Sequence, residues 1–294
     1  MTTDDDAIRL RLDLAYDGSA FSGWAAQPGR RTVQTVTEEG LLRVLRLSEP
    51  PRLTVAGRTD AGVHATGQVA HLDVPAIAWS GQADRVLRSL AGALPPDVRV
   101  RGLAPAPPGF DARFSALWRR YRYRVCDSPA AADPLRRRDT LWYPRPLRVD
   151  RMNEAGALLL GQHDFAAFCR RREGATTVRR LLRLDWSRES TGDGPGDGPG
   201  GEPNDEPNDE QGVAVATVVA DAFCHNMVRA VVGALLAVGE DRREPDWPRQ
   251  VLAAAVRDGA VHVAPAHGLC LAEVRYPQAG ELAARAAQTR RVRG

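Results

Sequence analysis

One aspartate, Asp60, stands among glycines in a stretch that otherwise has the pattern of two strands. In the segment AGRTDAGVH, Arg58 lies two residues before Asp60 and His64 four residues after it. The glycines permit a tight turn and the close approach of another chain, so the carboxylate would project into a cleft. The arginine is placed to bind phosphate in a bidentate manner. The same pattern also fits an Asx-turn with a solvent-facing ion pair, and spacing alone leaves both interpretations open.

Other chemistries fit this segment less well. Asp60 and His64 have the four-residue spacing of metal ligands on a helix, but the glycines disfavour a helix and no third ligand is near. The chain also lacks the nucleotide-binding pattern GxxxxGK[ST] and the nucleophile elbow GxSxG. His225 directly follows Cys224 without completing a zinc-type set. We therefore expect no metal site.

The segment FSALWRRYRYRV alternates aromatic and basic side chains in a pattern typical of a strand. On such a strand Tyr121 and Tyr123 share one face. The other face carries three arginines, Arg120, Arg122 and Arg124. Aromatic rings interleaved with arginines suit base stacking beside phosphate contacts. Tyrosines in the core of an amphipathic strand would give the same pattern, so both interpretations stay open.

The segment DAFCHNMVRAVVGALLAVG predicts a helix over residues 222–238, with an apolar stripe and a stop near Gly239. Arg229 falls within this mostly apolar stretch. A partly buried arginine needs a carboxylate partner, and Asp60 is a candidate. The alternative is an arginine that extends from the edge of the helix to solvent.

The spacing of apolar residues predicts the order strand, helix, strand, strand, helix, strand twice along the chain. In the first half the expected helices are 32–47, capped by Thr32, and 83–93, and the expected strands are 8–16, 52–56, 68–74 and 98–103. In the second half the expected helices are 150–161, capped by Asp150, and 222–238, and the expected strands are 120–126, 178–186, 213–220 and 270–276.

This repeated order is the ferredoxin-like pattern. We therefore expect an α+β protein of two ferredoxin-like βαββαβ halves, each an antiparallel sheet with helices on one face. The expected domains are residues 1–115, which carry the aspartate turn, and residues 116–280. A basic tail, residues 281–294, would follow them.

Charge is distributed unevenly along the 294 residues. Residues 188–212 hold eight acidic residues and one arginine, a net charge of −7, and because the whole chain carries +3 the remainder carries +10. A basic body indicates a polyanionic partner, although a general preference for arginine would give the same excess. The acidic segment is rich in Gly and Pro, so we expect a disordered insertion that lengthens a hairpin loop.

Composition places the chain in a broad class. An apolar content of 43% and a charged content of 26% are typical of a soluble globular protein. No run approaches the roughly 20 apolar residues of a membrane-spanning helix. The four cysteines are widely spaced, which argues against a zinc finger and a disulfide framework. The acidic start MTTDDDAIRL lacks the pattern of a signal peptide, so we expect a cytoplasmic protein without membrane contact.

Five segments together resemble the tRNA pseudouridine synthase A family. In chain order they are YDGSAFSGWAAQ, AGRTDAGVHATGQVAH, ARFSALWRRYRYRV, FCHNMVRAVVGALLAVG and APAHGLCLAEVRYP. The GRTDAGVHA block is the most specific of them, and the match covers nearly the whole chain. The resemblance implies a fold of two ferredoxin-like halves with a central basic cleft between them.

The resemblance also implies a function and its residues. Enzymes of this family isomerise uridine to pseudouridine at positions 38, 39 and 40 of the tRNA anticodon stem-loop, as homodimers that need no cofactor or metal. On this chain it makes Asp60 the catalytic aspartate and Tyr121 the aromatic residue that stacks on the flipped uracil. Arg229 would pair with the catalytic carboxylate. Arg58 would engage the RNA and occupy the space that the flipped base vacates.

Two other functions remain as alternatives. A non-catalytic RNA-binding module would need the arginines and tyrosines but not Asp60, so the intact turn favours an enzyme. A hydrolase with Asp60 as general base would need a second acid or a metal set, which the sequence does not offer.

Overall fold

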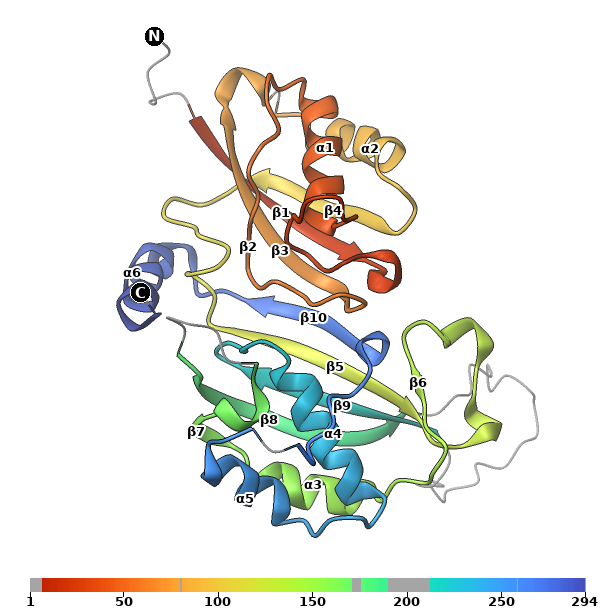
Figure 1. The fold of residues 1–294 in the computed structure, drawn as a ribbon. Coiled ribbons are helices and arrows are strands. Elements are labelled where there is room, and N and C mark those ends of the chain that lie inside the picture. The colour runs from red at the N-terminus through yellow and green to blue at the C-terminus, as the bar shows by residue number, and fades with distance from the viewer. Residues whose placement is uncertain (1–6, 80, 171–175, 190–211, 258, 294) are drawn as a thin grey trace, which may run out of the picture.

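A single sheet runs through the molecule and organises its helices (Figure 1). The computed structural model describes residues 7–79, 81–170, 176–189, 212–257 and 259–293. Within them the sheet has ten strands in the order β4-β1-β3-β10-β5-β9-β8-β7, with β2 beside β3 and β6 beside β5. Six α-helices accompany the sheet in the same residues. The α+β class predicted from the sequence is confirmed.

The elements have the following bounds. The strands are β1 Ala7–Tyr16, β2 Thr54–Val55, β3 His64–Pro75, β4 Val98–Pro105, β5 Trp118–Cys126, β6 Leu141–Trp142, β7 Gly161–Asp164, β8 Val178–Glu189, β9 Val213–Ala220 and β10 Leu269–Arg275. The helices are α1 Val33–Leu45, α2 Ala83–Ala93, α3 Val149–Ala157, α4 Met227–Gly239, α5 Trp247–Ala254 and α6 Leu282–Arg293. The basic tail expected from the sequence is therefore largely helix α6.

Local sequence patterns account for the first half. The side chains of Leu10, Leu12 and Leu14 are buried, as the alternation in β1 predicts. Helix α1 begins after Thr32, whose hydroxyl accepts a hydrogen bond from the backbone N–H of Thr35 at 3.3 Å. This is the expected N-cap, and it satisfies a backbone donor that has no partner within the helix. Helices α1 and α2 lie side by side on this end of the sheet (Figure 1).

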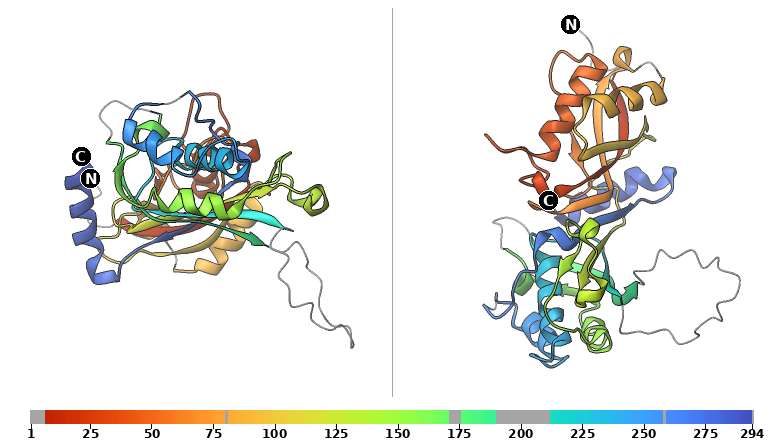
Figure 2. Two further views of the ribbon diagram at one scale, coloured as in Figure 1. Left: turned by 90° about the horizontal axis from the view of Figure 1, so that it is seen from below. Right: turned by 90° about the vertical axis from the view of Figure 1, so that its right-hand side faces the viewer.

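Helix α4 forms the core of the second half. Every residue of α4 except Arg229 is buried, which agrees with its apolar sequence. Helices α3 and α5 pack against it. Figure 2 shows that α1 and α2 lie at one end of the elongated molecule and α3, α4 and α5 at the other.

Strand β10 joins the two ends of the sheet. It comes from the C-terminal part of the chain and lies between β3 and β5 (Figure 1). It pairs in parallel with β3 and in antiparallel with β5. The expectation of two separate antiparallel sheets is therefore wrong, because β3 has one edge that accepts β10. A long-range pairing of this kind leaves no local trace in the sequence.

Gly67 of β3 leaves no room for a side chain beside β10, and it supports a first prediction. A Cβ built at Gly67 would lie 2.1 Å from the carbonyl oxygen of Ala272 in β10. We expect Gly67→Ala to force β3 and β10 apart and to lower the free energy of unfolding by about 1–3 kcal/mol. Urea denaturation measures this change. Gly92→Ala is the control, since nothing lies within 4 Å of a Cβ there and α2 gains a better helix former. Equal stability of the two variants would contradict the prediction.

The helix predicted at 222–238 begins only at Met227, so the prediction is wrong for residues 222–226. The carboxylate of Asp221 accepts hydrogen bonds from the backbone N–H groups of Arg180 and Ala222, which fixes a turn at the end of β9. Asn226 then adopts a left-handed conformation with φ of 66° directly before the helix. The residues between β9 and α4 are consequently a loop.

Two other expectations need correction. Helix α3 begins at Val149, so Asp150 lies in its first turn and is not the cap. Strand β8 extends to Glu189, two residues into the acidic segment predicted as an insertion, because Arg188 and Glu189 still pair with β9. The carboxylate of Glu189 also forms ion pairs with Arg122 and Arg124 of β5. The rest of that segment, residues 190–211, lies outside the described residues.

A buried carboxylate, that of Glu240, lies directly after the last residue of α4. Glu240 has a side chain only 2% exposed and forms ion pairs with Arg145 and Arg242. The hydroxyl of Tyr143 donates a hydrogen bond to its Oε1 at 2.6 Å. Burial alone would raise the pKa of Glu240, but the three donors outweigh burial and lower the pKa to about 2.

A pH-dependent contribution to stability follows from this cluster. The folded pKa of Glu240 lies below its ordinary value of 4.5, so the stabilisation is present above pH 4.5 and is lost as the pH falls towards 2. We expect Glu240→Gln to lower the free energy of unfolding at pH 7 by roughly 1–3 kcal/mol. In this variant the free energy of unfolding should also decrease less steeply than in the wild type as the pH falls from 4.5 towards 2. Denaturant titrations between pH 7 and pH 3 measure both effects. Glu244→Gln, at a position 85% exposed, should match the wild type; an identical loss there would contradict the prediction.

Candidate active site

Asp60 lies on the turn between β2 and β3. Backbone hydrogen bonds fix this turn, because Trp24 N–H donates to Thr59 O at 3.0 Å and Val63 N–H donates to Asp60 O at 3.2 Å. Gly23 adopts a φ of 94°, and a Cβ built there would lie 2.9 Å from Thr59 O. Only glycine combines this conformation with such a close approach. The loop that contains Gly23 and Trp24 therefore packs against this turn and fixes its backbone.

Buried side chains hold the same turn in place. The hydroxyl of Tyr16 lies 2.8 Å from the hydroxyl of Thr59. His64 is buried, and its Nδ1 accepts the backbone N–H of Gly18 at 3.0 Å. Its Nε2 therefore carries the proton and donates to the carbonyl oxygen of His267 at 3.0 Å. His64 thus fastens the turn to the segment before β10, which is a structural role.

The turn borders a large cleft with a volume of about 1030 Å³. All four residues singled out from the sequence line this cleft, namely Arg58, Asp60, Tyr121 and Arg229. Further arginines line it as well, namely Arg52, Arg113, Arg119 and Arg179. Asp60 is the only carboxylate among the described residues of the lining. The cleft is therefore a strongly basic site with a single acidic group, which suits a polyanionic ligand.

Among the arginines of β5, Arg119 lines the cleft. The three arginines that the alternating pattern places on one face do not line it. Arg119 is buried on the same face as Tyr121. Its guanidinium donates to the carbonyl oxygens of Ala56 and Asp221 at 2.7 Å each, and so links the strand before the turn to the loop before α4. The arginines of the other face form ion pairs: Arg120 with Glu273 of the adjacent strand β10, and Arg122 and Arg124 with Glu189 of β8, two strands away.

The two tyrosines of β5 differ in their surroundings. The hydroxyl of Tyr123 donates to the carbonyl oxygen of Pro265 at 2.8 Å, and its ring is fully buried. Tyr121 is 7% exposed and lines the cleft, with its ring edge-to-face against Phe223 at 5.0 Å. Burial raises the pKa of Tyr121, so its hydroxyl stays protonated at neutral pH. Tyr123 is a core residue, whereas Tyr121 presents a fixed aromatic ring at the cleft.

Arg229 and Asp60 line the same cleft but do not form an ion pair with each other in the described part of the chain. Arg229 Nε donates instead to the carbonyl oxygen of Ala264 at 2.6 Å. The group within ion-pair distance of Asp60 is His225, whose Nε2 lies 3.4 Å from Asp60 Oδ1. The sequence brings up His225 only as a possible zinc ligand, and its contact with Asp60 was not expected because residues 222–226 were predicted to be helical. Its position in the FCHNMVR segment, next to Arg229, was the available signal.

Comparison with known proteins identifies the family. A family model described as "tRNA pseudouridine synthase" matches residues 155–277. A tRNA pseudouridine synthase A from Streptomyces griseus is 57% identical over 97% of this chain and 94% of its own length. Another from Frankia casuarinae is 60% identical over 98% of this chain and 97% of its own length. A third, from Mycobacterium leprae, is 47% identical over 97% of this chain and 96% of its own length.

The chain belongs to the tRNA pseudouridine synthase A family. The resemblance noted in the sequence is thereby confirmed. In this synthase the cleft brings together residues that lie far apart in the chain, from the turn at Asp60 to the first turn of α4 at Arg229. Arg58 is exposed at the cleft, where its guanidinium is accessible to a ligand.

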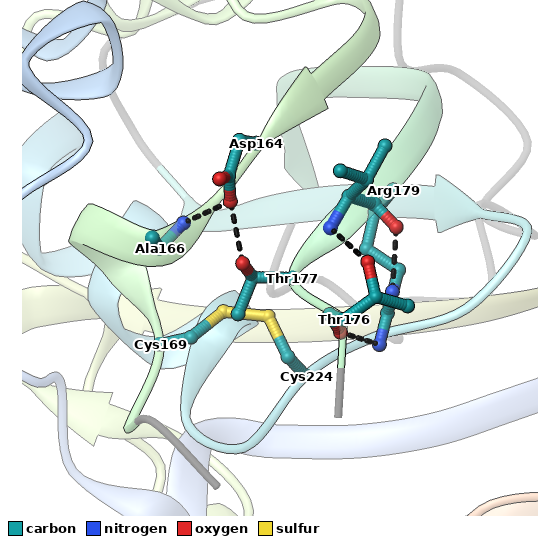
Figure 3. Close-up of a disulfide and its surroundings, with 8 residues drawn as sticks. Asp164, Ala166, Cys169, Thr176, Thr177, Arg179 and Cys224 are labelled. Carbon is teal, nitrogen blue, oxygen red and sulfur yellow. Dashed lines mark hydrogen bonds between the residues drawn. A yellow bond between two sulfur atoms is a disulfide. The ribbon is translucent and has the colours of Figure 1, made fainter. Parts of the chain in front are cut away.

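A disulfide lies beside the cleft of the synthase. Cys169 and Cys224 are 55 residues apart in the sequence and are bonded, with Cα atoms 5.8 Å apart (Figure 3). The wide spacing of the cysteines did not indicate this bond, so the expectation of no disulfide is wrong, because spacing along the chain does not report proximity in space. Cys169 ends a short turn in which Asp164 accepts the backbone N–H of Ala166 at 3.0 Å (Figure 3). Cys224 belongs to the loop before α4 and lines the cleft.

The described residues contain no group of three or more His, Cys, Asp or Glu side chains arranged to hold a metal ion. None of their helices has the length and apolar character needed to cross a bilayer.

Proposed function

We propose that the chain isomerises uridine to pseudouridine at positions 38, 39 and 40 of the tRNA anticodon stem-loop, with Asp60 as the catalytic residue. One observation carries this proposal: Asp60 is the single carboxylate among the described residues that line an arginine-rich cleft. Its family makes the chain an isomerase that acts on tRNA. The choice of tRNA positions rests on the resemblance.

The target base must first leave the stack. Unstacking and unpairing one nucleotide costs a few kcal/mol. The ring of Tyr121, held edge-to-face by Phe223, offers a platform for the flipped uracil, and stacking on such a platform returns about 1–3 kcal/mol per base. Arg58 is exposed beside Asp60 and fills the space that the base vacates. Two other exposed arginines of the cleft, Arg52 and Arg113, bind the phosphates on either side.

The reaction rearranges one nucleotide without net loss or gain of atoms. The N1–C1′ glycosidic bond breaks, the uracil turns while it stays bound in the cleft, and a C5–C1′ bond forms. The proton on C5 leaves and N1 gains a proton, so neither a redox partner nor a second substrate is needed. Asp60 supplies the carboxylate that acts on the nucleotide, and the turn holds it rigidly enough for that role.

The strand order supports the proposed architecture. The first half has the order β4-β1-β3-β2 and the second half the order β10-β5-β9-β8. When the short strands β6 and β7 are left aside and the other strands are numbered within each half, both orders read 4-1-3-2, which is the order of a ferredoxin-like unit. We therefore propose two ferredoxin-like halves, 1–115 and 116–280, with the basic cleft between them. We further expect a homodimer in which one tRNA contacts both subunits.

Position mapping tests the proposed substrate. tRNA transcripts carrying uridine at only one of positions 38, 39 or 40 are incubated with the protein and treated with a carbodiimide that marks pseudouridine. Reverse transcription should stop at the single uridine in each of the three transcripts. A matched transcript with cytidine at all three positions, but uridine in its other loops, should give no stop. Stops elsewhere in the tRNA would contradict the assignment to the anticodon stem-loop.

A further inference from the structure

The loop between β9 and α4 carries two features that the isomerisation described above does not use. Its Cys224 is bonded to Cys169, and the next residue, His225, lies with Nε2 at 3.4 Å from Asp60 Oδ1. The two features are adjacent in the chain, and they connect the proposed catalytic carboxylate to a covalent cross-link.

The backbone around His225 is held on both sides. The N–H of Arg170 donates to the carbonyl oxygen of His225 at 3.0 Å, directly beside the disulfide. The N–H of Met227 donates to the carbonyl oxygen of Cys224 at 3.0 Å, where the chain enters α4. The segment at Cys169 and Arg170 therefore fixes the loop at two consecutive residues, through one covalent bond and one hydrogen bond.

The histidine occupies the place expected for an orienting group. Within the described residues its side chain is the only basic one at ion-pair distance from Asp60, because Arg229 is directed to the carbonyl oxygen of Ala264. A donor on Oδ1 restricts rotation of the carboxylate and leaves Oδ2 for the substrate. Hydrogen bonds at a site without its substrate are often long and tighten in the complex, so 3.4 Å fits this role.

We propose that His225 is a positioning residue for Asp60, and that the Cys169–Cys224 disulfide acts on the reaction by fixing the loop that carries it. The inference rests on the proposed function, in which Asp60 is the catalytic group. A displacement of about 1 Å at a reacting group can cost on the order of 100-fold in rate, so the position of this loop bears on turnover.

Variants of His225 test the positioning role. We expect His225→Ala to lower kcat about 10- to 100-fold on tRNA while KM changes less than about twofold, because the histidine orients Asp60 and does not bind RNA. Glutamine places an N–H donor near the position of Nε2, so His225→Gln should recover at least half of the lost factor on a logarithmic scale. An unchanged kcat in His225→Ala, or a glutamine variant no better than alanine, would overturn the role. Thermal unfolding shows that each variant is folded.

Cysteine variants test the link to the disulfide. The oxidised protein should titrate two thiols, those of the free cysteines Cys126 and Cys270. We expect Cys169→Ser to lower kcat several-fold, and Cys126→Ser, the control, to leave it unchanged. The decisive variant combines Cys169→Ser with His225→Ala, which should be no slower than His225→Ala alone, since the disulfide acts through the histidine. Losses that multiply in the double variant, or four titratable thiols in the oxidised wild type, would overturn the link.

Different results would overturn the proposed function and the positioning role of His225. A wild type that binds tRNA but turns over no substrate would overturn the proposed function, and this inference with it. An active wild type with a fully active His225→Ala would overturn this inference alone.

Discussion

Asp60→Asn is expected to bind tRNA with nearly wild-type affinity and to lose turnover by about 10³-fold or more. Asparagine keeps the size and shape of the aspartate but removes the negative charge of its carboxylate, and the described residues that line the cleft offer no other acid to replace it. The arginines of the cleft, which should supply most of the affinity for phosphates, are unchanged. Single-turnover rates and filter binding measured on the same tRNA preparation separate the two effects.

A matched control shows that the loss belongs to this site. Asp84→Asn makes the same chemical change at an exposed residue in the first turn of α2, which does not line the cleft. It should have wild-type turnover. An Asp60→Asn variant that retains a tenth or more of the wild-type rate would show that the reaction does not depend on this carboxylate.

Tyr121→Ala is expected to lower kcat/KM by about 5- to 150-fold, which corresponds to loss of the 1–3 kcal/mol of stacking that an aromatic platform provides. Tyr121→Phe keeps the ring and its edge-to-face contact with Phe223, so it should bind the flipped base as well as the wild type. Steady-state kinetics of both variants, together with tRNA binding, separate the platform from the hydroxyl. If the phenylalanine variant binds normally but reacts slowly, the protonated hydroxyl takes part in the chemistry.

Tyr123→Phe is the control for this pair. Its hydroxyl bonds to Pro265 O in the core, so the variant should lose about 1 kcal/mol of stability without a change in kcat/KM. A Tyr121→Ala variant with wild-type kcat/KM would contradict the platform role.

Elements that depend on local patterns were predictable from the sequence. The alternation in β1 and β5 places the right residues inside, and Thr32 caps α1 as its hydroxyl and position require. The start of α4 was not predictable in this way. Residues 222–226 contain no glycine or proline, and the turn that ends the strand depends on a contact between Asp221 and β8. Joining of the halves through β10 likewise depends on residues far apart in the chain.

The candidate site likewise contains residues that local motifs identify and contacts that only the folded chain creates. Sequence motifs identified four of its residues, and the structure brings all of them to one cleft, namely Arg58, Asp60, Tyr121 and Arg229. The contact between His225 and Asp60 was out of reach, because it depends on how the loop before α4 folds over the turn. The disulfide was out of reach for the same reason, since its two cysteines meet only in the folded chain.

The measurement to make first uses tRNA transcripts tritiated at C5 of uridine and the wild-type protein. Formation of each pseudouridine replaces the C5–H bond with a C5–C1′ bond and releases that tritium to water. We expect release from transcripts with uridine at positions 38, 39 or 40 and none from a transcript with cytidine at all three. No release from any transcript, despite tight binding, would contradict the proposed isomerisation and favour a binding module that recognises tRNA without chemistry.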